Sequence, residues 1–196
     1  MIEDHSIWGL IGGIIGSAAT FLAKSVWDNA IQREKEISLA IWKIKADEME
    51  KRLSTFYWPL YMCLQRDDLM WKKVFSDLRM RSDAPKAWVK NLSEEDRKNL
   101  SSELENNVLI PNHKDAVDII RSKMYISAVT PELARLLFAY VRHVDGYIAL
   151  RSAGIKGIDP IDIEEKYPEG LSAAVKARLD DFQAAYEKLL REKELI

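Results

Sequence analysis

The stretch IWGLIGGIIGSAATFLA, residues 7–23, contains no charged side chain and decides how the chain is organised. A bilayer core about 30 Å thick requires roughly 20 apolar residues in a helix. Lys24 can extend its ammonium group to the lipid headgroups, so the apolar helix can reach Trp27. We therefore predict a transmembrane helix over 7–27. The alternative is a buried helix of a soluble protein, in which each glycine would cost about 1 kcal/mol relative to alanine.

Aromatic and charged residues at the two ends support this prediction. Trp8 and Trp27 would lie about 28 Å apart on a straight helix, which matches the two interfacial aromatic belts of a bilayer. We therefore assign Trp8, Trp27 and Lys24 as interfacial anchors. Residues 1–6 contain no Lys or Arg, whereas basic residues follow the helix. By the positive-inside rule, we expect an uncleaved signal-anchor in the cell (inner) membrane, with the N-terminus outside and the remaining chain in the cytoplasm.

Glycines repeat at helical spacing within the predicted membrane segment. Gly9 and Gly13 are four residues apart, as are Gly12 and Gly16. Small residues at this spacing let two membrane helices approach closely. We expect these four glycines to form an interface between membrane helices, and hence a homo-oligomer in contact with membrane lipid.

Composition limits the remaining possibilities. The 196 residues carry a formal net charge of −2, with acids and bases mixed along the chain, so no basic stripe predicts nucleic-acid binding. The lone cysteine, Cys63, excludes a disulfide framework and a thiolate metal site. The three histidines are far apart in the sequence. We therefore predict no metal site, no cofactor and no nucleic-acid partner.

Residues 28–58 contain no glycine or proline, and we expect the membrane helix to continue through them as a stalk. Ile37, Ile41 and Ile44 share one face of this helix. Two interpretations remain open: the stalk is part of an oligomeric coiled coil, or its apolar face packs on its own domain. Pro59 then either kinks or ends the helix.

Residues 59–196 show helical periodicity and no convincing alternation with period two, which predicts a cytoplasmic helical bundle. A loop is expected at 79–85, and Asn112 is expected to cap a helix. Thr130 and Pro131 begin the best core helix, which should stop at Gly154. The helices are expected over 60–78, 94–107, from 112, 131–153 and 171–194. The loop 154–170 is long for a bundle, and long ordered loops are often functional.

The densest polar cluster lies on the helix expected over 131–153. Arg142, His143, Asp145 and Arg151 form either a partner or ligand groove with acid–base character, or an Arg142–Asp145 ion pair beside a half-buried histidine. Mixed charge on a helix usually marks a solvated face. We found no spacing typical of a nucleophile, so we predict no catalytic residues.

The resulting functional hypothesis is a non-enzymatic, single-pass membrane protein that self-associates and binds a protein partner through its cytoplasmic bundle. The alternative is a membrane effector or sensor whose bundle receives a signal and alters the membrane through the stalk. A membrane-tethered enzyme with its site near Arg142 and Asp145 is the third reading.

Overall fold

The computed structural model describes the backbone of residues 5–78, 86–155 and 158–193, and side chains from Lys24 onward except Lys73 and Ser76. Helices account for 87% of the chain, and no strand occurs in the described part, which confirms the all-α prediction. The loop predicted at 79–85 lies outside the described residues. The chain divides into an N-terminal unit, Met1–Asp47 with Glu187–Ile196, and a bundle unit, Glu48–Tyr186.

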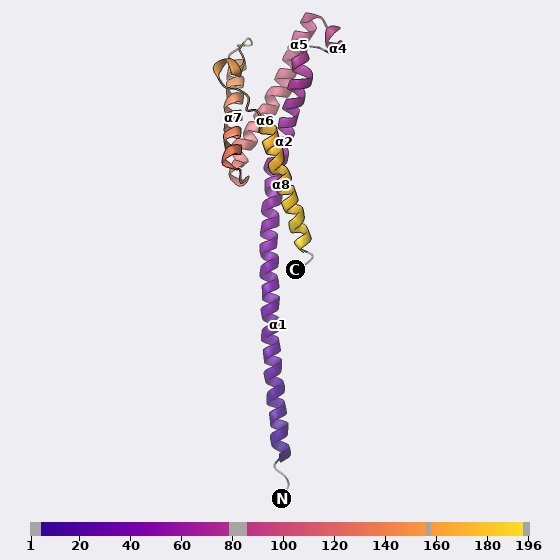
Figure 1. Cartoon of the computed structure of the whole chain (residues 1–196), viewed down its shortest axis with the longest axis vertical. Coiled ribbons are helices and arrows are strands. Elements are labelled where there is room, and N and C mark those ends of the chain that lie inside the picture. Colours follow the sequence, from indigo (N-terminus) through magenta and orange to yellow (C-terminus); the bar gives the residue numbers. More distant parts are fainter. Residues whose placement is uncertain (1–4, 79–85, 156–157, 194–196) are drawn as a thin grey trace. The chain divides into compact units, whose positions relative to one another are not determined.

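The N-terminal unit is built mainly from α1, which spans His5–Arg52 without a break (Figure 1). Continuity follows from the sequence, because no proline and no glycine beyond Gly16 interrupts these residues. The side chains of 7–23 lie outside those described, so most of the predicted membrane segment is untested. Among the described residues, no helix is long and apolar enough to cross a membrane.

The end of α8 (Leu171–Glu192) completes the N-terminal unit. The indole nitrogen of Trp42 donates a hydrogen bond of 2.7 Å to the carbonyl of Leu189, and the Lys193 ammonium lies 5.0 Å from the Trp42 ring centroid. Several apolar side chains of α1 nevertheless remain at least 40% exposed. They are Val26, Trp27, Ile31, Ile37, Leu39, Ile41 and Ile44.

The bundle unit begins with the last turn of α1 and continues into α2 (Trp58–Met70). A π-helical turn, Leu53–Tyr57, joins the two helices directly before Pro59. Proline lacks the N–H that a regular helix needs, and the wider turn absorbs this interruption. Pro59 therefore does not end the helical run, so that alternative is excluded. Phe56 and Tyr57 are fully buried, which places the end of the predicted stalk in the bundle core.

A second π-helical turn, Trp71–Phe75, follows α2, and a third, Glu105–Leu109, joins α5 (Glu94–Leu104) to α6 (Ile110–Lys123) close to Pro111. The expectation that Asn112 caps a helix is therefore wrong, because Asn112 lies inside a continuing helical run and its side chain is buried. Two short helices precede this run, α3 (Ser76–Leu78) and α4 (Ala87–Lys90).

The start and end of α7 (Pro131–Ser152) were predicted correctly. The Thr130 hydroxyl accepts a hydrogen bond from the backbone N–H of Leu133, as an N-cap residue should. Gly154 follows the helix with a φ of +76°, a left-handed conformation that glycine adopts without a steric penalty.

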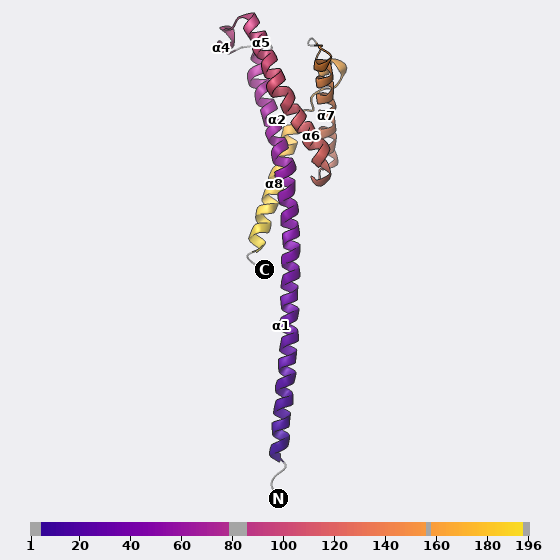
Figure 2. The same cartoon turned by 180° about the vertical axis from the view of Figure 1, so that it is seen from behind.

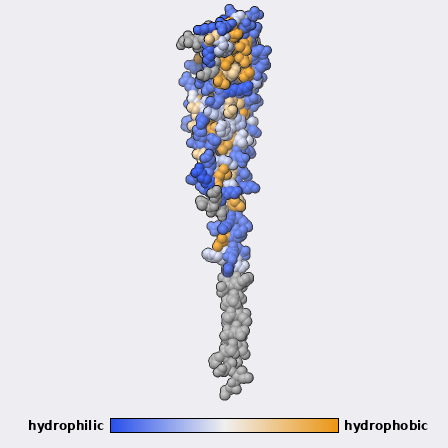
Figure 3. All heavy atoms as spheres, turned by 90° about the vertical axis from the view of Figure 1, so that its right-hand side faces the viewer, coloured by the Kyte–Doolittle hydropathy of each residue, from blue (hydrophilic) through white to orange (hydrophobic). Residues whose placement is uncertain are grey.

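Four helices share the core of the bundle unit, and α6 lies between α2 and α7 in both views (Figures 1 and 2). Each helix contributes residues at helical spacing to one apolar cluster. The fully buried members include Leu60 and Leu64 of α2, Ala116 of α6, Leu137 and Val144 of α7, and Leu171, Val175 and Leu179 of α8. The face drawn in Figure 3 is mostly hydrophilic in its described part, with apolar residues exposed among the polar ones.

Candidate ligand-binding cavity

A cavity of about 940 Å³ opens in the bundle unit beside the shared core. Its walls come from α2, α6, α7, the loop after α7 and the first turns of α8. Aromatic side chains line much of it: Tyr61, Trp71, His113, His143, Tyr147 and Tyr167. A cavity of this size, mostly apolar with a few convergent polar groups, has the character of a small-molecule site.

A buried carboxylate organises the floor of the cavity. Asp67 is only 5% exposed, and its two oxygens accept from three donors. The Asn112 amide nitrogen lies 2.6 Å from Oδ1, while the Tyr140 hydroxyl and His113 Nδ1 lie 2.8 Å and 3.0 Å from Oδ2. A second hydrogen of the Asn112 amide is donated to the carbonyl of Cys63 at 2.8 Å. A buried charge requires such partners, and together they fix the side chains around it.

This arrangement defines the hydrogen-bonding state of His113. Its Nδ1 also lies 2.9 Å from the Tyr140 oxygen. Because a carboxylate oxygen only accepts, we assign a proton to Nδ1, which donates it to Asp67. Burial, followed by the Asp67 charge, raises the pKa of Tyr140 well above its usual range, so this phenol stays protonated and keeps donating.

His143, at another part of the cavity lining, also donates a hydrogen bond from Nδ1. Its Nδ1 lies 2.8 Å from the backbone carbonyl of Glu165, and since a carbonyl cannot donate, Nδ1 carries the hydrogen. Burial lowers the pKa of His143 below the usual histidine range, although the bond to Glu165 opposes this shift. The neutral ring therefore offers the lone pair of Nε2.

Tyr167 is the unsatisfied group of this region. Its hydroxyl is buried and has no hydrogen-bond partner among the described residues. Burial raises the pKa of Tyr167, and the charges of Asp67 and Asp68 add to the effect, so the hydroxyl remains protonated. An unpaired buried hydroxyl costs about 1–3 kcal/mol, which makes it a group that a bound water or ligand would satisfy.

The structure divides the polar cluster predicted on α7. Arg142 lies 3.3 Å from Glu165, and Asp145 lies 2.6 Å from Arg121, so the predicted Arg142–Asp145 pair is replaced by pairs to other elements. Both residues are exposed. Only His143 of the four predicted groove residues lines the cavity.

Arg151, the fourth residue, holds the loop after α7 in place. Its guanidinium lies 2.7 Å from Glu105 and 2.6 Å from Asp159, and 4.6 Å from the Tyr147 ring centroid. Arg151 also donates to the backbone carbonyls of Ile155 and Ile158. These contacts fix the long loop expected at 154–170. Its residues that line the cavity are Asp159, Pro160, Ile161, Lys166, Tyr167, Glu169 and Gly170.

The side chains that line the cavity can hydrogen-bond to a ligand, but none of them is an evident nucleophile. The Asp67–His113 pair resembles a carboxylate that orients an imidazole base. Cys63 contacts the network through its backbone, and burial with the Asp67 charge raises the pKa of its thiol to about 11, so it remains protonated. Among residues with described side chains, no group of three or more His, Cys, Asp or Glu is placed to hold a metal ion.

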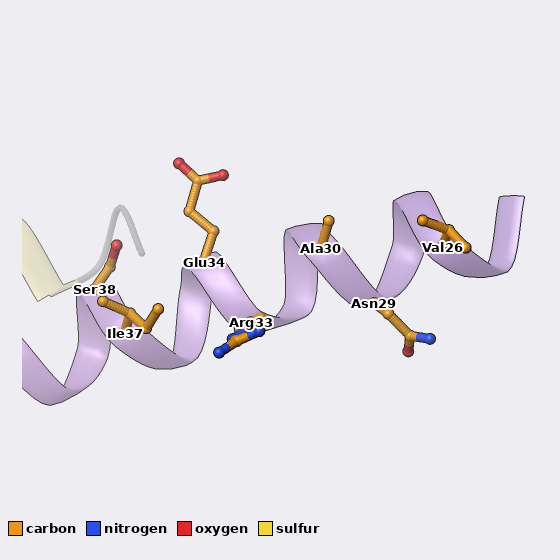
Figure 4. A pocket seen from close by; sticks show the side chains of 7 residues that line it. All are labelled: Val26, Asn29, Ala30, Arg33, Glu34, Ile37 and Ser38. Carbon is orange, nitrogen blue, oxygen red and sulfur yellow. The ribbon is translucent and has the colours of Figure 1, made fainter. Parts of the chain in front are cut away.

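The remaining predicted site residues concern α1. Gly9, Gly12, Gly13, Gly16 and Trp8 lie outside the residues whose side chains are described. Trp27 and Lys24 are exposed, and their assignment as interfacial anchors stays a prediction. A hollow on α1 between Val26 and Ser38 is lined by this helix alone, and its side chains project in several directions (Figure 4). It is therefore a surface depression and not an enclosed site.

Comparisons with protein-family models, with curated proteins and with solved structures found no match to this chain. The assignment of the site therefore rests on its geometry. Sequence reasoning missed Asp67, Asn112, His113, Tyr140 and Tyr167 as members of one site. A signal was available, because Asp67 continues the helical spacing of the buried Leu60 and Leu64.

Proposed function

We propose that this protein is a membrane-anchored sensor or effector whose bundle unit receives a small molecule in the cavity above Asp67. One observation carries this proposal: the cavity is large enough for a ligand and is floored by a buried, fully partnered carboxylate. Such preorganised polar groups at the base of an aromatic cavity are typical of ligand sites. This observation favours a sensor over the partner-binding protein that the sequence alone suggested first.

In this proposal, residues 7–27 cross the cell membrane, with the N-terminus outside and the bundle unit in the cytoplasm. Support comes from the uncharged run 7–23 and from the basic residues that follow it. Extraction of membranes with alkaline carbonate tests the anchor. Full-length protein should stay in the pellet, and its release into the supernatant would contradict the anchor.

The cavity has a matched pair of positions for testing ligand binding. Ala173 and Ala177 are both exposed on α8, one turn apart, but only Ala173 lines the cavity. Ala173→Trp should therefore fill the opening without disturbing the core, whereas Ala177→Trp is the control. A ligand that binds only the folded state raises the unfolding temperature.

The experiment adds the small-molecule fraction of a cell extract to purified full-length protein. We expect it to raise the unfolding temperature of the wild type and of Ala177→Trp, but not of Ala173→Trp. No stabilisation of any form, or equal stabilisation of all three, would overturn the cavity as the receiving site.

A second candidate function, a self-associating protein that binds a protein partner, is favoured by the exposed apolar side chains of α1. Ile37, Ile41 and Ile44 share one face and are 49–61% exposed. The glycines of the membrane segment would extend such an interface. Replacing Gly12 and Gly16 with Ile should weaken self-association in detergent. An unchanged oligomer would locate the contact elsewhere in the chain.

A further inference from the structure

We infer that the ligand of this cavity is a nucleotide whose base carries an amino group, such as adenine or cytosine. This inference rests on the proposed ligand-binding function and names the class of molecule. It follows from three layers of the cavity lining, which differ in burial and in chemistry: an acceptor-rich floor, aromatic walls and a lysine-bearing rim.

The floor favours a neutral group that donates hydrogen bonds. The carboxylate of Asp67 is buried there, and Asp68 is close by on the same helix. His143 offers the lone pair of Nε2, because its Nδ1–H is donated to the Glu165 carbonyl. An anionic group would be repelled by these carboxylates. The buried end of the ligand therefore supplies donors.

Tyr167 adds a complementary requirement. Its buried hydroxyl has no partner among the described residues and stays protonated, so it can donate to a ring nitrogen of the ligand. The rings of His143 and Tyr167 are neighbours, with centroids 5.5 Å apart. An amino group beside a ring nitrogen, as on adenine and cytosine, presents a donor and an acceptor next to each other and can serve both side chains.

The walls favour a flat aromatic body. Tyr61, Trp71 and Tyr147 all line the cavity, and they range from buried (Tyr147) through half-buried (Tyr61) to exposed (Trp71). Trp71 is 41% exposed, so part of its side chain is accessible to solvent. Stacking of a base on such rings contributes to binding without restricting which base is bound.

The rim favours an anionic tail. Lys72, Lys166 and Lys176 all line the cavity and are exposed. Lys72 and Lys176 pair with Asp68 and Asp180 on their own helices, and such exposed pairs are weak enough to exchange for a phosphate. Asp68, Asp159 and Glu169 also line the cavity, and their charges oppose this attraction in part. A simple amine would make no ion pair with the lysines, and free phosphate would make no contact with the acceptors of the floor or the aromatic side chains of the walls.

The experiment is titration calorimetry of full-length protein with AMP and CMP as probes and with IMP, adenosine and inorganic phosphate as comparisons. IMP reverses the donor and acceptor at the base edge, and adenosine lacks the phosphate. We expect AMP or CMP to bind, IMP and adenosine to bind about tenfold more weakly than AMP, and phosphate alone not to bind, since one lost hydrogen bond or ion pair corresponds to about that factor.

Two variants test the assigned contacts. Tyr167→Phe removes only an unpartnered, costly hydroxyl, so the unfolding temperature of the unliganded protein should not fall, while AMP binds about tenfold more weakly. Lys166→Gln should weaken AMP but not adenosine, whereas the exposed Lys188→Gln outside the cavity should change neither.

Equal affinity for AMP and IMP, or affinity for AMP unchanged by both Tyr167→Phe and Ala173→Trp, would overturn the inference. Absence of binding by AMP and CMP would overturn it as well. If cell extract still stabilised the wild type but not Ala173→Trp, the ligand class would be wrong while the proposed function stood. If extract also had no effect, both would fail.

Discussion

Asp67 in the bundle unit and the exposed residues of α1 in the N-terminal unit show two different uses of a helical surface. Asp67 is a charge on an otherwise apolar face, buried and held by Asn112, His113 and Tyr140. On α1, Ile37 and Ile41 are apolar residues left about half exposed. In both places the polarity of the side chain is opposite to that of its environment. Such inconsistencies mark positions where function competes with stability.

The comparison also separates two kinds of cost. Burying the Asp67 carboxylate is costly unless its partners are fixed, so its network constrains the fold. Exposing isoleucines on a helix costs little in stability, but it creates a surface that a second molecule can cover. Mutations in the Asp67 network should therefore change the free energy of unfolding, whereas mutations of the exposed isoleucines of α1 should change self-association.

The largest effect is expected from Asp67→Ala. This change removes the common acceptor of three buried donors and should lower the free energy of unfolding by about 3–5 kcal/mol. Urea unfolding followed by tryptophan fluorescence measures it. Asp68→Ala is the control, because its exposed ion pair with Lys72 contributes at most about 1 kcal/mol. Similar losses in the two variants would show that the Asp67 network does not hold the core.

Tyr140→Phe should have a smaller effect at the same place. It removes the hydroxyl that donates to Asp67 and lies against His113, while the ring remains packed. We expect a loss of about 1–2 kcal/mol in the free energy of unfolding. Tyr125→Phe, at a side chain that is 79% exposed, should change it by less than about 0.5 kcal/mol. A neutral Tyr140→Phe would mean that this hydrogen bond contributes no stability.

The pH dependence of stability tests the buried, neutral state of His143. Its pKa is lower in the folded state than in the unfolded chain, so the unfolded chain binds the proton more readily. Stability should therefore fall as the pH drops through about 6.5, the usual histidine value, and below it. His143→Asn should flatten this part of the profile. Identical profiles for the wild type and the variant would contradict the assignment.

The smallest effect on stability is expected from Ile41→Ser on α1. Its side chain is 49% exposed, so the free energy of unfolding should change by less than about 0.5 kcal/mol. Sedimentation analysis should instead show weaker self-association. Leu69→Ser, at an exposed residue of the bundle unit, should leave self-association unchanged. A destabilised monomer with unchanged association would show that the α1 face packs within its own chain.

Local patterns in the sequence were enough to predict the helices and several of their ends. Thr130 and Gly154 were identified because a side-chain cap and a left-handed glycine act within one turn. Pro59 left a kink and a helix end both open, and the cap expected at Asn112 was wrong, because π-helical turns next to Pro59 and Pro111 let the helical run continue. A proline by itself does not reveal which of these outcomes the surrounding core favours.

The candidate site was less predictable, because its members come from separate helices. The helical spacing in the sequence places Asp67 on the same face as the apolar Leu60 and Leu64. Its hydrogen-bond partners on α6 and α7, however, depend on how three helices pack. Arg142 and Asp145 have the spacing of an ion pair within one helix, yet each contacts a residue of another segment. Weak exposed pairs of this kind are decided by tertiary neighbours.

Tyr167 is the most direct probe of the cavity, because its buried hydroxyl has no hydrogen-bond partner among the described residues. Full-length protein with ¹³C-labelled tyrosine would be observed by NMR while the small-molecule fraction of a cell extract is added. We predict a saturable shift of the Tyr167 resonance in the wild type and in Ala177→Trp, and none in Ala173→Trp. A Tyr167 resonance that stays unchanged in the wild type at every extract concentration would contradict the proposal that this cavity receives a ligand.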